Sequence, residues 1–326
     1  MDDMSVMTGQ ESARRRFTAE ILGTDAAPEP LPLSGRVARG VVVDATPSLL
    51  CLVTLRGEER FLIDERTTLW KGDEAAVSSL VCGDDAVVLR PPAGGPVAER
   101  VWAQPARATG VITEVDGHTL EIDPGHGRPR VPVVVPYRSS GRISVRHPRL
   151  EPGYVFDAVG VWREGAVWVT RPATTQPPYP LHAAPYRPPT SRYSGTVTGI
   201  ATWYDPAFGR SPHLDERAVA NGAAYPALDP VGHADTCDRR TSCVPLPLLS
   251  TGTTVRLRND CTSETTVVPL VDCAAADSWI CDLCPTCGGQ AAGRVVSLTV
   301  AGFVALGGRL EEGCFNATMT VPNGEG

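Results

Sequence analysis

Eight of the ten cysteines lie between Cys237 and Cys314, and this clustering restricts what the C-terminal part of the chain can fold into. Stretches this rich in cysteine are typical of small, loop-rich modules that are cross-linked in an oxidising compartment. Pairs close in sequence, such as Cys237 with Cys243 and Cys261 with Cys273, fit the spacing, but spacing leaves the connectivity open. The sequence predicts a disulfide framework made of Cys237, Cys243, Cys261, Cys273, Cys281, Cys284, Cys287 and Cys314.

The spacing Cys281-x-x-Cys284-x-x-Cys287 also resembles half of a structural zinc site. Structural zinc is usually held by two closely spaced ligand pairs in a tetrahedral arrangement. Here the other cysteines are scattered and no histidine stands beside this segment. Disulfides are therefore favoured over zinc, and no metal or cofactor is predicted.

The composition favours short strands joined by many turns. Of the 326 residues, 42% are apolar, enough for buried cores, while 32 Gly and 30 Pro supply turns. A net charge of −7 argues against a nucleic-acid partner, which requires a basic surface. No apolar run approaches the length of a membrane helix, and Arg14–Arg16 are not followed by the apolar segment of a signal peptide. We therefore expect an all-β protein with no transmembrane segment and no recognisable signal peptide.

Residues 35–172 contain two copies of one pattern of short β-rich runs. Gly83 recurs as Gly153, 70 residues later, and Trp102 recurs as Trp168, 66 residues later. Repeated runs of this kind, broken by Gly, Asp and Pro, predict two small OB-like β-barrels at 35–104 and 105–172. The polar residues 1–34 are expected to form a flexible N-terminal arm. The expected role of the two barrels is that of a scaffold or spacer.

A Pro-rich linker is predicted at 173–193, because prolines favour a semi-extended chain. Beyond it, residues 194–326 read as a compact closed barrel of short strands with one short helix. The expected strands are Ser194–Trp203, Thr253–Leu257, Thr265–Val271 and Val295–Leu298, and the helix is Ala301–Leu306.

Five short motifs in this last region follow one another in a recognisable order. They are Ala201–Tyr204, Ala220–Gly222, Gly252–Leu257, Val267–Asp272 and Ser297–Thr299. In this order and spacing they resemble the double-psi β-barrel of rare lipoprotein A-like (RlpA-like) and expansin-like proteins, over about a third of the chain. The resemblance implies a disulfide-rich double-psi β-barrel at 194–326 that acts on cell-wall polysaccharide.

The same resemblance implies catalytic positions. In its lytic-transglycosylase members an Asp and an upstream His carry catalysis; Asp272 matches the Asp, whereas the His position falls near Cys243. His233, the nearest candidate histidine, matches only after a ten-residue slip, and the acid of expansins falls on Ser297. A second registration, through the segment that begins at Asp282, places Asp282 at the site instead. We favour Asp272, because it ends a predicted strand.

Asp205 is a third candidate catalytic residue. Glycoside hydrolases of family 45 share this barrel and place a general-base Asp just after an aromatic pair on the first strand, as Trp203 and Tyr204 precede Asp205 here. An inverting mechanism needs two carboxyl groups roughly 6.5–9.5 Å apart, which Asp205 and Asp272 could supply. The alternatives are structural: Asp205 caps a turn, and Asp272 accepts backbone N–H bonds at the barrel rim.

Aromatic side chains indicate where a sugar would bind. Trp203, Tyr204 and Tyr225, together with Asn221, are predicted to line a groove, because aromatic faces stack on sugar rings. The favoured function is extracellular or cell-envelope binding of wall polysaccharide (peptidoglycan or a cellulose-like glycan), with weak or lost cleavage. An active lytic transglycosylase or glycoside hydrolase using Asp272 is one alternative, and a self-assembling structural protein of an extracellular surface is another.

Overall fold

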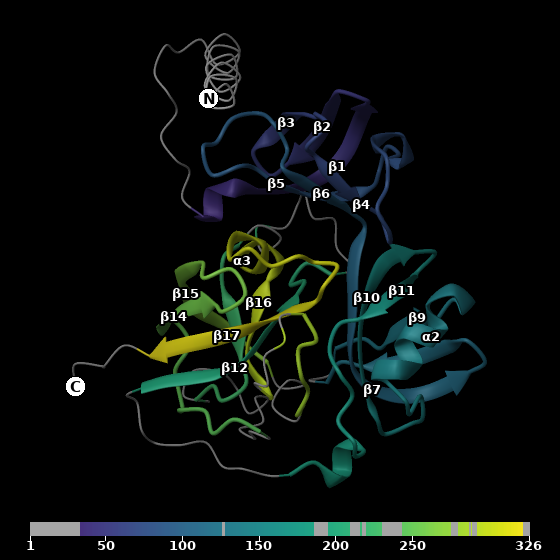
Figure 1. The fold of residues 1–326 in the computed structure, drawn as a ribbon, viewed down its shortest axis with the longest axis vertical. Helices are drawn as coiled ribbons and strands as arrows, with labels where there is room; N and C mark the ends of the chain where they lie inside the picture. The colour runs from purple at the N-terminus through teal and green to yellow at the C-terminus, as the bar shows by residue number, and fades with distance from the viewer. Residues whose placement is uncertain are drawn as a thin grey trace, which may run out of the picture.

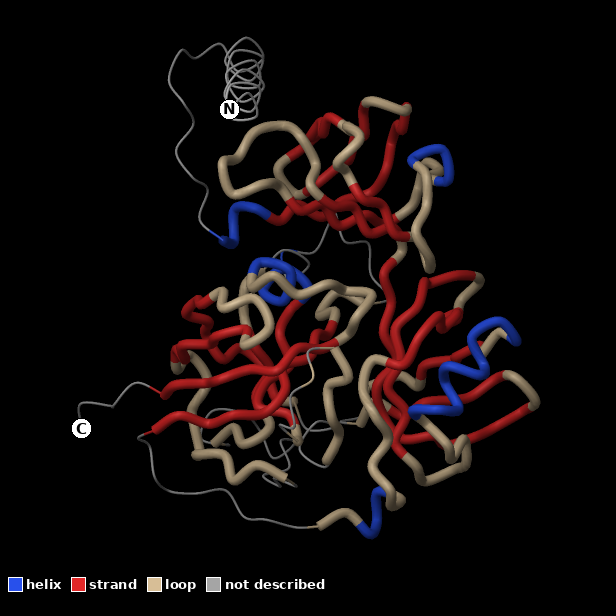
Figure 2. Tube along the Cα trace, in the orientation of Figure 1, coloured by secondary structure: helices blue, strands red, loops and turns tan. Residues whose placement is uncertain are grey.

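The protein is described here from a computed structural model, in which three β-rich units pack around a common centre (Figures 1 and 2). The model describes residues 33–125, 128–185, 195–208, 216, 220–229, 243–274, 280–286, 288 and 292–321. Residues 1–32 of the predicted arm, His233, Cys237 and Cys287 lie outside the described residues. The predicted all-β class is confirmed.

The first unit is a six-stranded sheet with the strand order β3-β2-β1-β5-β6-β4. A parallel bridge from Leu62, at the end of β3, to Val97, just before β6, curls the sheet back on itself. The bridge brings the end of β3 beside the segment that leads into β6, as in the predicted barrel, while β4 pairs with β6 itself. The elements are η1 (Leu33–Arg36), β1 (Val37–Thr46), β2 (Leu49–Thr54), β3 (Gly57–Leu62), β4 (Thr68–Trp70), η2 (Val77–Ser79), β5 (Asp85–Leu89) and β6 (Arg100–Ala103).

The second unit is a closed five-stranded barrel, as predicted, with one helix between its third and fourth strands. Strand β7 pairs with both β8 and β10, and the parallel pair of β9 and β11 completes the ring. This connectivity is that of an OB-like barrel. The elements are β7 (Pro105–Asp116), β8 (Thr119–Asp123), β9 (Val131–Val134), α2 (Tyr137–Arg146), β10 (Val155–Arg163) and β11 (Ala166–Pro172).

The 70-residue period is visible in the backbone of these two units. The amide of Gly83 donates to the carbonyl of Val42, and the amide of Gly153 donates to the carbonyl of Ile112, with donor and acceptor both shifted by 70 residues. Gly83 and Gly153 have φ angles of 94° and 89°, a region that glycine enters without a steric penalty. The repeat in the sequence therefore marks one loop-to-strand contact that is made twice.

The third unit is a closed barrel with the order β12-β16-β13-β15-β14-β17. Two of its pairings are parallel, β12 with β16 and β13 with β15. If β12, β13 and β14 are exchanged in sequence order for β15, β16 and β17, the same set of strand pairs results. This internal symmetry is expected of a barrel built from two interlocked halves. The ends of the predicted strands and helix agree with the observed ends to within two residues. The elements are β12 (Gly195–Tyr204), β13 (Ala223–Tyr225), β14 (Thr254–Asn259), β15 (Thr265–Cys273), β16 (Arg294–Thr299), α3 (Val300–Ala305) and β17 (Cys314–Val321).

One buried apolar cluster includes residues of all three units, while the first unit and the second barrel also have cores of their own. Trp70 and Trp102 of the first unit belong to the same buried cluster as Phe303 of the C-terminal barrel. The indole nitrogen of Trp102 donates to Glu311 at 2.5 Å. The start of the predicted linker is packed as well, because Ala173 and Thr174 are fully buried, and η3 (Leu181–Ala183) follows.

A buried ion network joins the second barrel to the C-terminal barrel. Asp157 on β10 accepts hydrogen bonds from Arg107 on β7 and from Arg294 on β16, each at 2.6 Å. Arg294 also contacts Asp282 at 2.8 Å, and Arg107 donates to the carbonyl of Trp203 at 3.0 Å. Burial would raise the pKa of Asp157, but Arg107 and Arg294 lower it well below its ordinary value. The carboxylate of Asp157 is therefore charged and shared between two units.

His147, just after α2, supports this network as a neutral side chain. Its Nε2 accepts a hydrogen bond from the amide of Asp157 at 3.0 Å. Burial lowers the pKa of His147 to about 4, although the charge of Asp157 opposes this shift. The acceptor role at Nε2 requires the neutral ring, which fits the lowered pKa.

We predict that stability falls as the pH decreases through this lowered pKa. An unfolded histidine titrates near pH 6.5, so between pH about 6.5 and about 4 the unfolded chain binds more protons than the folded protein. The free energy of unfolding should drop by roughly 3 kcal/mol across that window. Urea unfolding at several pH values measures this. His147→Gln should flatten the dependence and the exposed control His118→Gln should not; an unchanged slope in His147→Gln would contradict the assignment.

Candidate functional site

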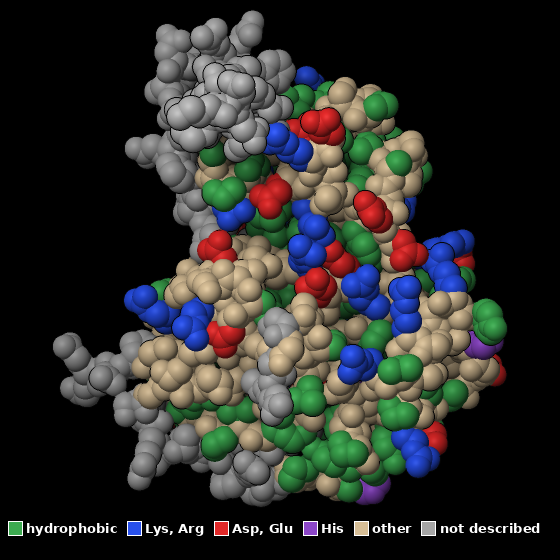
Figure 3. All heavy atoms as spheres, in the orientation of Figure 1, with side chains coloured by type: hydrophobic (Ala, Val, Ile, Leu, Met, Phe, Trp, Pro, Cys, Tyr) green, Lys and Arg blue, Asp and Glu red, His purple; other side chains and the backbone are tan. Residues whose placement is uncertain are grey.

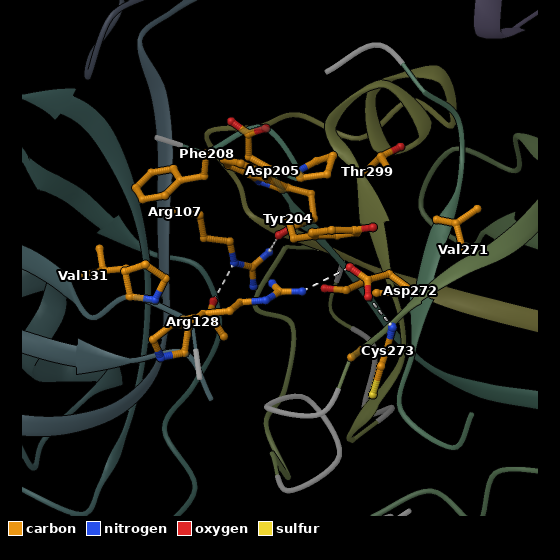
Figure 4. Close-up of a pocket in the computed structure, with 18 of the residues that line it drawn as sticks. Arg107, Arg128, Val131, Tyr204, Asp205, Phe208, Val271, Asp272, Cys273 and Thr299 are labelled. Carbon is orange, nitrogen blue, oxygen red and sulfur yellow. Dashed lines mark hydrogen bonds and ion pairs between the residues drawn. The ribbon is translucent and has the colours of Figure 1, made fainter. Parts of the chain in front are cut away.

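A cavity of about 740 Å³ lies between the second barrel and the C-terminal barrel (Figure 4). Residues 128–132, which precede and begin β9, and Trp162 on β10 form one side. The other side crosses β12, β16, β13 and β15, which are consecutive around the C-terminal barrel. The C-terminal barrel therefore forms one half of a composite cavity, which Trp203 and Tyr204 of the predicted groove border and which Tyr225 does not.

Three aromatic side chains border the cavity in addition to the largely buried Trp203. Tyr204, at the end of β12, is half-buried, and Figure 4 shows it between Arg107 and Asp272. Phe208 follows β12 and meets Trp162 edge to face, with ring centroids 4.8 Å apart. These rings come from both barrels, so a ligand in the cavity would contact both.

One ion pair spans the cavity. Arg128 donates to Oδ2 of Asp272 at 3.1 Å, and their side chains are 45% and 41% exposed. Oδ1 of Asp272 accepts from the amide of Cys273 at 2.7 Å. Arg130 lines the same wall, and in Figure 3 Lys and Arg side chains gather where the second barrel meets the other units. Asp272 thus lies at the barrel rim, as expected, within reach of solvent and a ligand.

Asp205 also lines the cavity, but Arg39 of the first unit holds it. Arg39 donates to Oδ1 at 2.8 Å and to Oδ2 at 2.7 Å, and the amide of Ala207 donates to Oδ1 at 2.9 Å. The Asp205 side chain is only 7% exposed. Burial would lower the pKa of Arg39, but Asp85 and Asp205 raise it above its ordinary value. Both Asp205 oxygens are therefore engaged by a permanent cation, and the contact from the Ala207 amide is of the turn-capping kind expected in the structural alternative.

Two of the predicted binding aromatics are core residues. Tyr225 is fully buried and its hydroxyl donates to the carbonyl of Pro247 at 2.8 Å, so the prediction that its face lines a groove is wrong. Trp203 borders the cavity but is only 2% exposed, and its indole nitrogen donates to the carbonyl of Leu310 at 3.0 Å. Both point inward because alternate side chains of a barrel strand face its interior.

Asn221 and Ser297 mark the edge of the site. Ser297 lines the cavity, is 5% exposed and shares a hydrogen bond of 2.7 Å with Thr202. Asn221 stands beside the cavity residue Ala220, and its buried Oδ1 has no hydrogen-bond partner among the described residues. A Cβ at Gly302 would lie 2.8 Å from that oxygen, so Asn221 faces α3.

Asp282 does not belong to the site. It is fully buried, is absent from the cavity lining and is held by Arg294, so the second registration is corrected. Burial raises the pKa of Asp282; Arg294 lowers it but only partly offsets this effect, and the charge of Asp157 raises it further.

The disulfide prediction is confirmed for the described cysteines. Cys243 pairs with Cys281 and Cys284 with Cys314, which rules out the pair of Cys237 with Cys243 and the zinc alternative for Cys281 and Cys284. Cys261 and Cys273 are also disulfide-bonded. Within the described ranges, no group of three His, Cys, Asp or Glu side chains could hold a metal ion.

The sequence-based prediction missed the contribution of the second barrel. Trp162, Arg128 and Arg130 were assigned to a spacer, and no local pattern connects them with a motif about 140 residues further on. Only the packing of the two barrels brings them together. Phe208 was missed for a different reason, because it follows the matched motif and is not part of it.

Comparison with known proteins gives little support of its own. No family model and no curated protein matches the chain. Among solved structures, the apo expansin of Clavibacter michiganensis is similar at 20% identity with a TM-score of 0.22. The match covers 40% of this chain and 53% of the expansin, about half its length. Such a likeness does not show family membership. In the part of the chain that is described, no helix is long and apolar enough to cross a membrane.

The burial of Trp203 predicts a loss of stability when its ring is removed. Trp203→Ala should lower the free energy of unfolding by about 3–5 kcal/mol, because a large buried side chain leaves a cavity. Tyr204→Ala, next to it and half-buried, should cost clearly less. Chemical denaturation of the two variants measures the difference; equal, small losses would mean that Trp203 is not a core residue.

Proposed function

We propose that this protein binds a cell-wall polysaccharide in the cavity between its second barrel and its C-terminal barrel, and that it does so without efficient cleavage. The observation that carries the proposal is the composite cavity, which combines aromatic faces with exposed charged groups. Sugars present apolar ring faces and hydroxyl edges, and they need both kinds of partner.

The aromatic groups supply the apolar part of the recognition. Tyr204 and Phe208 come from the C-terminal barrel and Trp162 from the second barrel. Aromatic rings bury large areas at a low cost in side-chain entropy, since they have few rotatable bonds. A glycan strand lying along β12, β16, β13 and β15 would meet these rings at one end of the cavity.

The Arg128–Asp272 pair supplies the polar part. Both side chains are more than 40% exposed, so each keeps acceptor or donor capacity for sugar hydroxyls. Arg130 adds a further exposed donor on the same wall. A glycan that bridges Arg128 and Asp272 would therefore contact both barrels at once.

The surroundings of the carboxylates favour binding over catalysis. General acid and base groups each contribute typically 10²–10⁴-fold, so an efficient glycosidase needs two of them free to exchange protons. Asp205 is committed to Arg39 through both oxygens, and Cys243 and Ser297 stand where the resembling families carry a His and an acid. Asp272 is left without a second free acid among the described cavity residues.

The oxidised cysteines support a location outside the reducing cytosol. The pairs Cys243–Cys281 and Cys284–Cys314 both lie in the C-terminal barrel, which forms half of the cavity. Disulfides of this kind persist in extracellular and envelope compartments. An extracellular or envelope site is also where wall polysaccharide is encountered.

Retention on insoluble glycans tests the proposed binding. The full protein should be retained on at least one of peptidoglycan, cellulose and chitin, and Phe208→Ala or Arg128→Gln should weaken retention roughly ten-fold, equivalent to about 1.4 kcal/mol. Arg163→Gln is the matched control, since Arg163 is an exposed, ion-paired arginine outside the cavity. Retention on none of the three glycans, or equal weakening by Arg163→Gln, would refute the cavity as a glycan site.

A second experiment tests the absence of efficient cleavage. Incubation with purified peptidoglycan sacculi should release neither anhydro-muropeptides nor new reducing ends above background. Asp272→Asn should keep the side-chain shape and leave retention on the glycan within about three-fold, equivalent to about 0.7 kcal/mol. Robust release that disappears in Asp272→Asn would instead show that Asp272 is a catalytic acid.

A further inference from the structure

Helix α2 lies on the second barrel (Figure 1), and its exposed side combines basic and apolar side chains. Its inner side is fixed, because Ile143 is fully buried and Ser139 donates to the carbonyl of Val169 on β11 at 2.9 Å. The outer side is therefore held in one orientation. It carries two adjacent rows of exposed residues that are four apart, a spacing that aligns side chains along a helix.

The first row is basic. Arg138, Arg142 and Arg146 are all exposed, and α2 contains no acidic residue. Among the described residues, none of these three arginines has a carboxylate within ion-pair distance, whereas most other arginines of the second barrel are paired. The row is therefore a local concentration of positive charge that no described carboxylate neutralises, on a chain whose net charge is −7.

The second row is apolar. Tyr137 is 87% exposed and Val145 is 77% exposed, with Gly141 between them. These are the two most exposed large hydrophobic side chains in the described part of the chain. They lie directly beside the basic row, so the outer surface of α2 pairs protruding apolar groups with positive charges.

We propose that this surface of α2 binds peripherally to an anionic phospholipid bilayer. Arginines on a helix bind lipid phosphates while neighbouring aromatic and aliphatic side chains enter the headgroup region. A soluble polyanion would use the arginines but leave Tyr137 and Val145 in water, and a neutral surface would use only the apolar row. An anionic bilayer uses both rows at once.

The contact is shallow and depends on salt. Only two apolar side chains reach the bilayer, so the arginines supply most of the attraction. The net charge of −7 does not favour approach of the whole molecule to an anionic surface, so the attraction has to come from a local basic surface such as that of α2. The contact would hold the cavity near a membrane, and it does not depend on the proposed glycan binding.

Co-sedimentation of the full, oxidised protein with vesicles tests this proposal. Vesicles of phosphatidylcholine are compared with vesicles in which phosphatidylglycerol makes up about a third of the lipid. We expect retention on the anionic vesicles at low salt and its loss at about 0.5 M salt, where the screening length is roughly 4 Å. The combined variant Arg138→Gln, Arg142→Gln and Arg146→Gln should weaken retention about 100-fold, or about five-fold per arginine.

Two matched variants make the test specific. Arg56→Gln with Arg60→Gln and Arg66→Gln removes the same charge from exposed positions of the first unit and should leave retention unchanged. Tyr137→Ser with Val145→Ser should weaken vesicle retention several-fold but leave binding to soluble polyphosphate unchanged. No retention on anionic vesicles, an equal loss in the control triple variant, or vesicle retention insensitive to Tyr137→Ser with Val145→Ser would each overturn the proposal; the last would indicate a polyanion site.

Discussion

The carboxylate of Asp157 is the interaction on which the arrangement of the two barrels depends. It receives Arg107 from its own barrel and Arg294 from the C-terminal barrel, and Thr174 adds a hydrogen bond of 2.8 Å. All of these groups are buried, and removal of one partner from a buried ion pair typically costs about 3–5 kcal/mol. Since Arg107 also donates to the carbonyl of Trp203, the same network fixes the end of β12, where the cavity begins.

The cavity belongs to no single unit. The C-terminal barrel contributes the strands that resemble a polysaccharide-active family, the second barrel contributes the facing wall, and the first unit contributes Arg39 behind Asp205. Each contribution changes the chemistry. The second barrel adds Arg128 opposite Asp272, and Arg39 occupies the carboxylate that a two-acid mechanism would use. Residues of both N-terminal units therefore line or support the cavity.

The same packing separates two kinds of aromatic residue that look alike in the sequence. Trp203 and Tyr204 are neighbours in one motif and both border the cavity, yet Trp203 is almost fully buried while Tyr204 is only half-buried. Alternation along a strand requires neighbouring side chains to face opposite sides, so at most one of the pair can present an open ring to a ligand. Tyr225 follows the same rule and lies inside the barrel.

Local patterns in the sequence determined the all-β class, the 70-residue repeat with its two positive-φ glycines, the strands of the C-terminal barrel and the oxidised state of its described cysteines. These follow from alternation, turn residues and composition, which act over a few residues. Tertiary structure decided the rest. It decided that Cys243 pairs with Cys281 and that Asp282 is buried. It also decided that Arg39 forms an ion pair with Asp205 and that Arg128 lies opposite Asp272, 144 residues away in the sequence. No local signal encodes such partners, because they result from how the three units pack against one another through a common buried cluster.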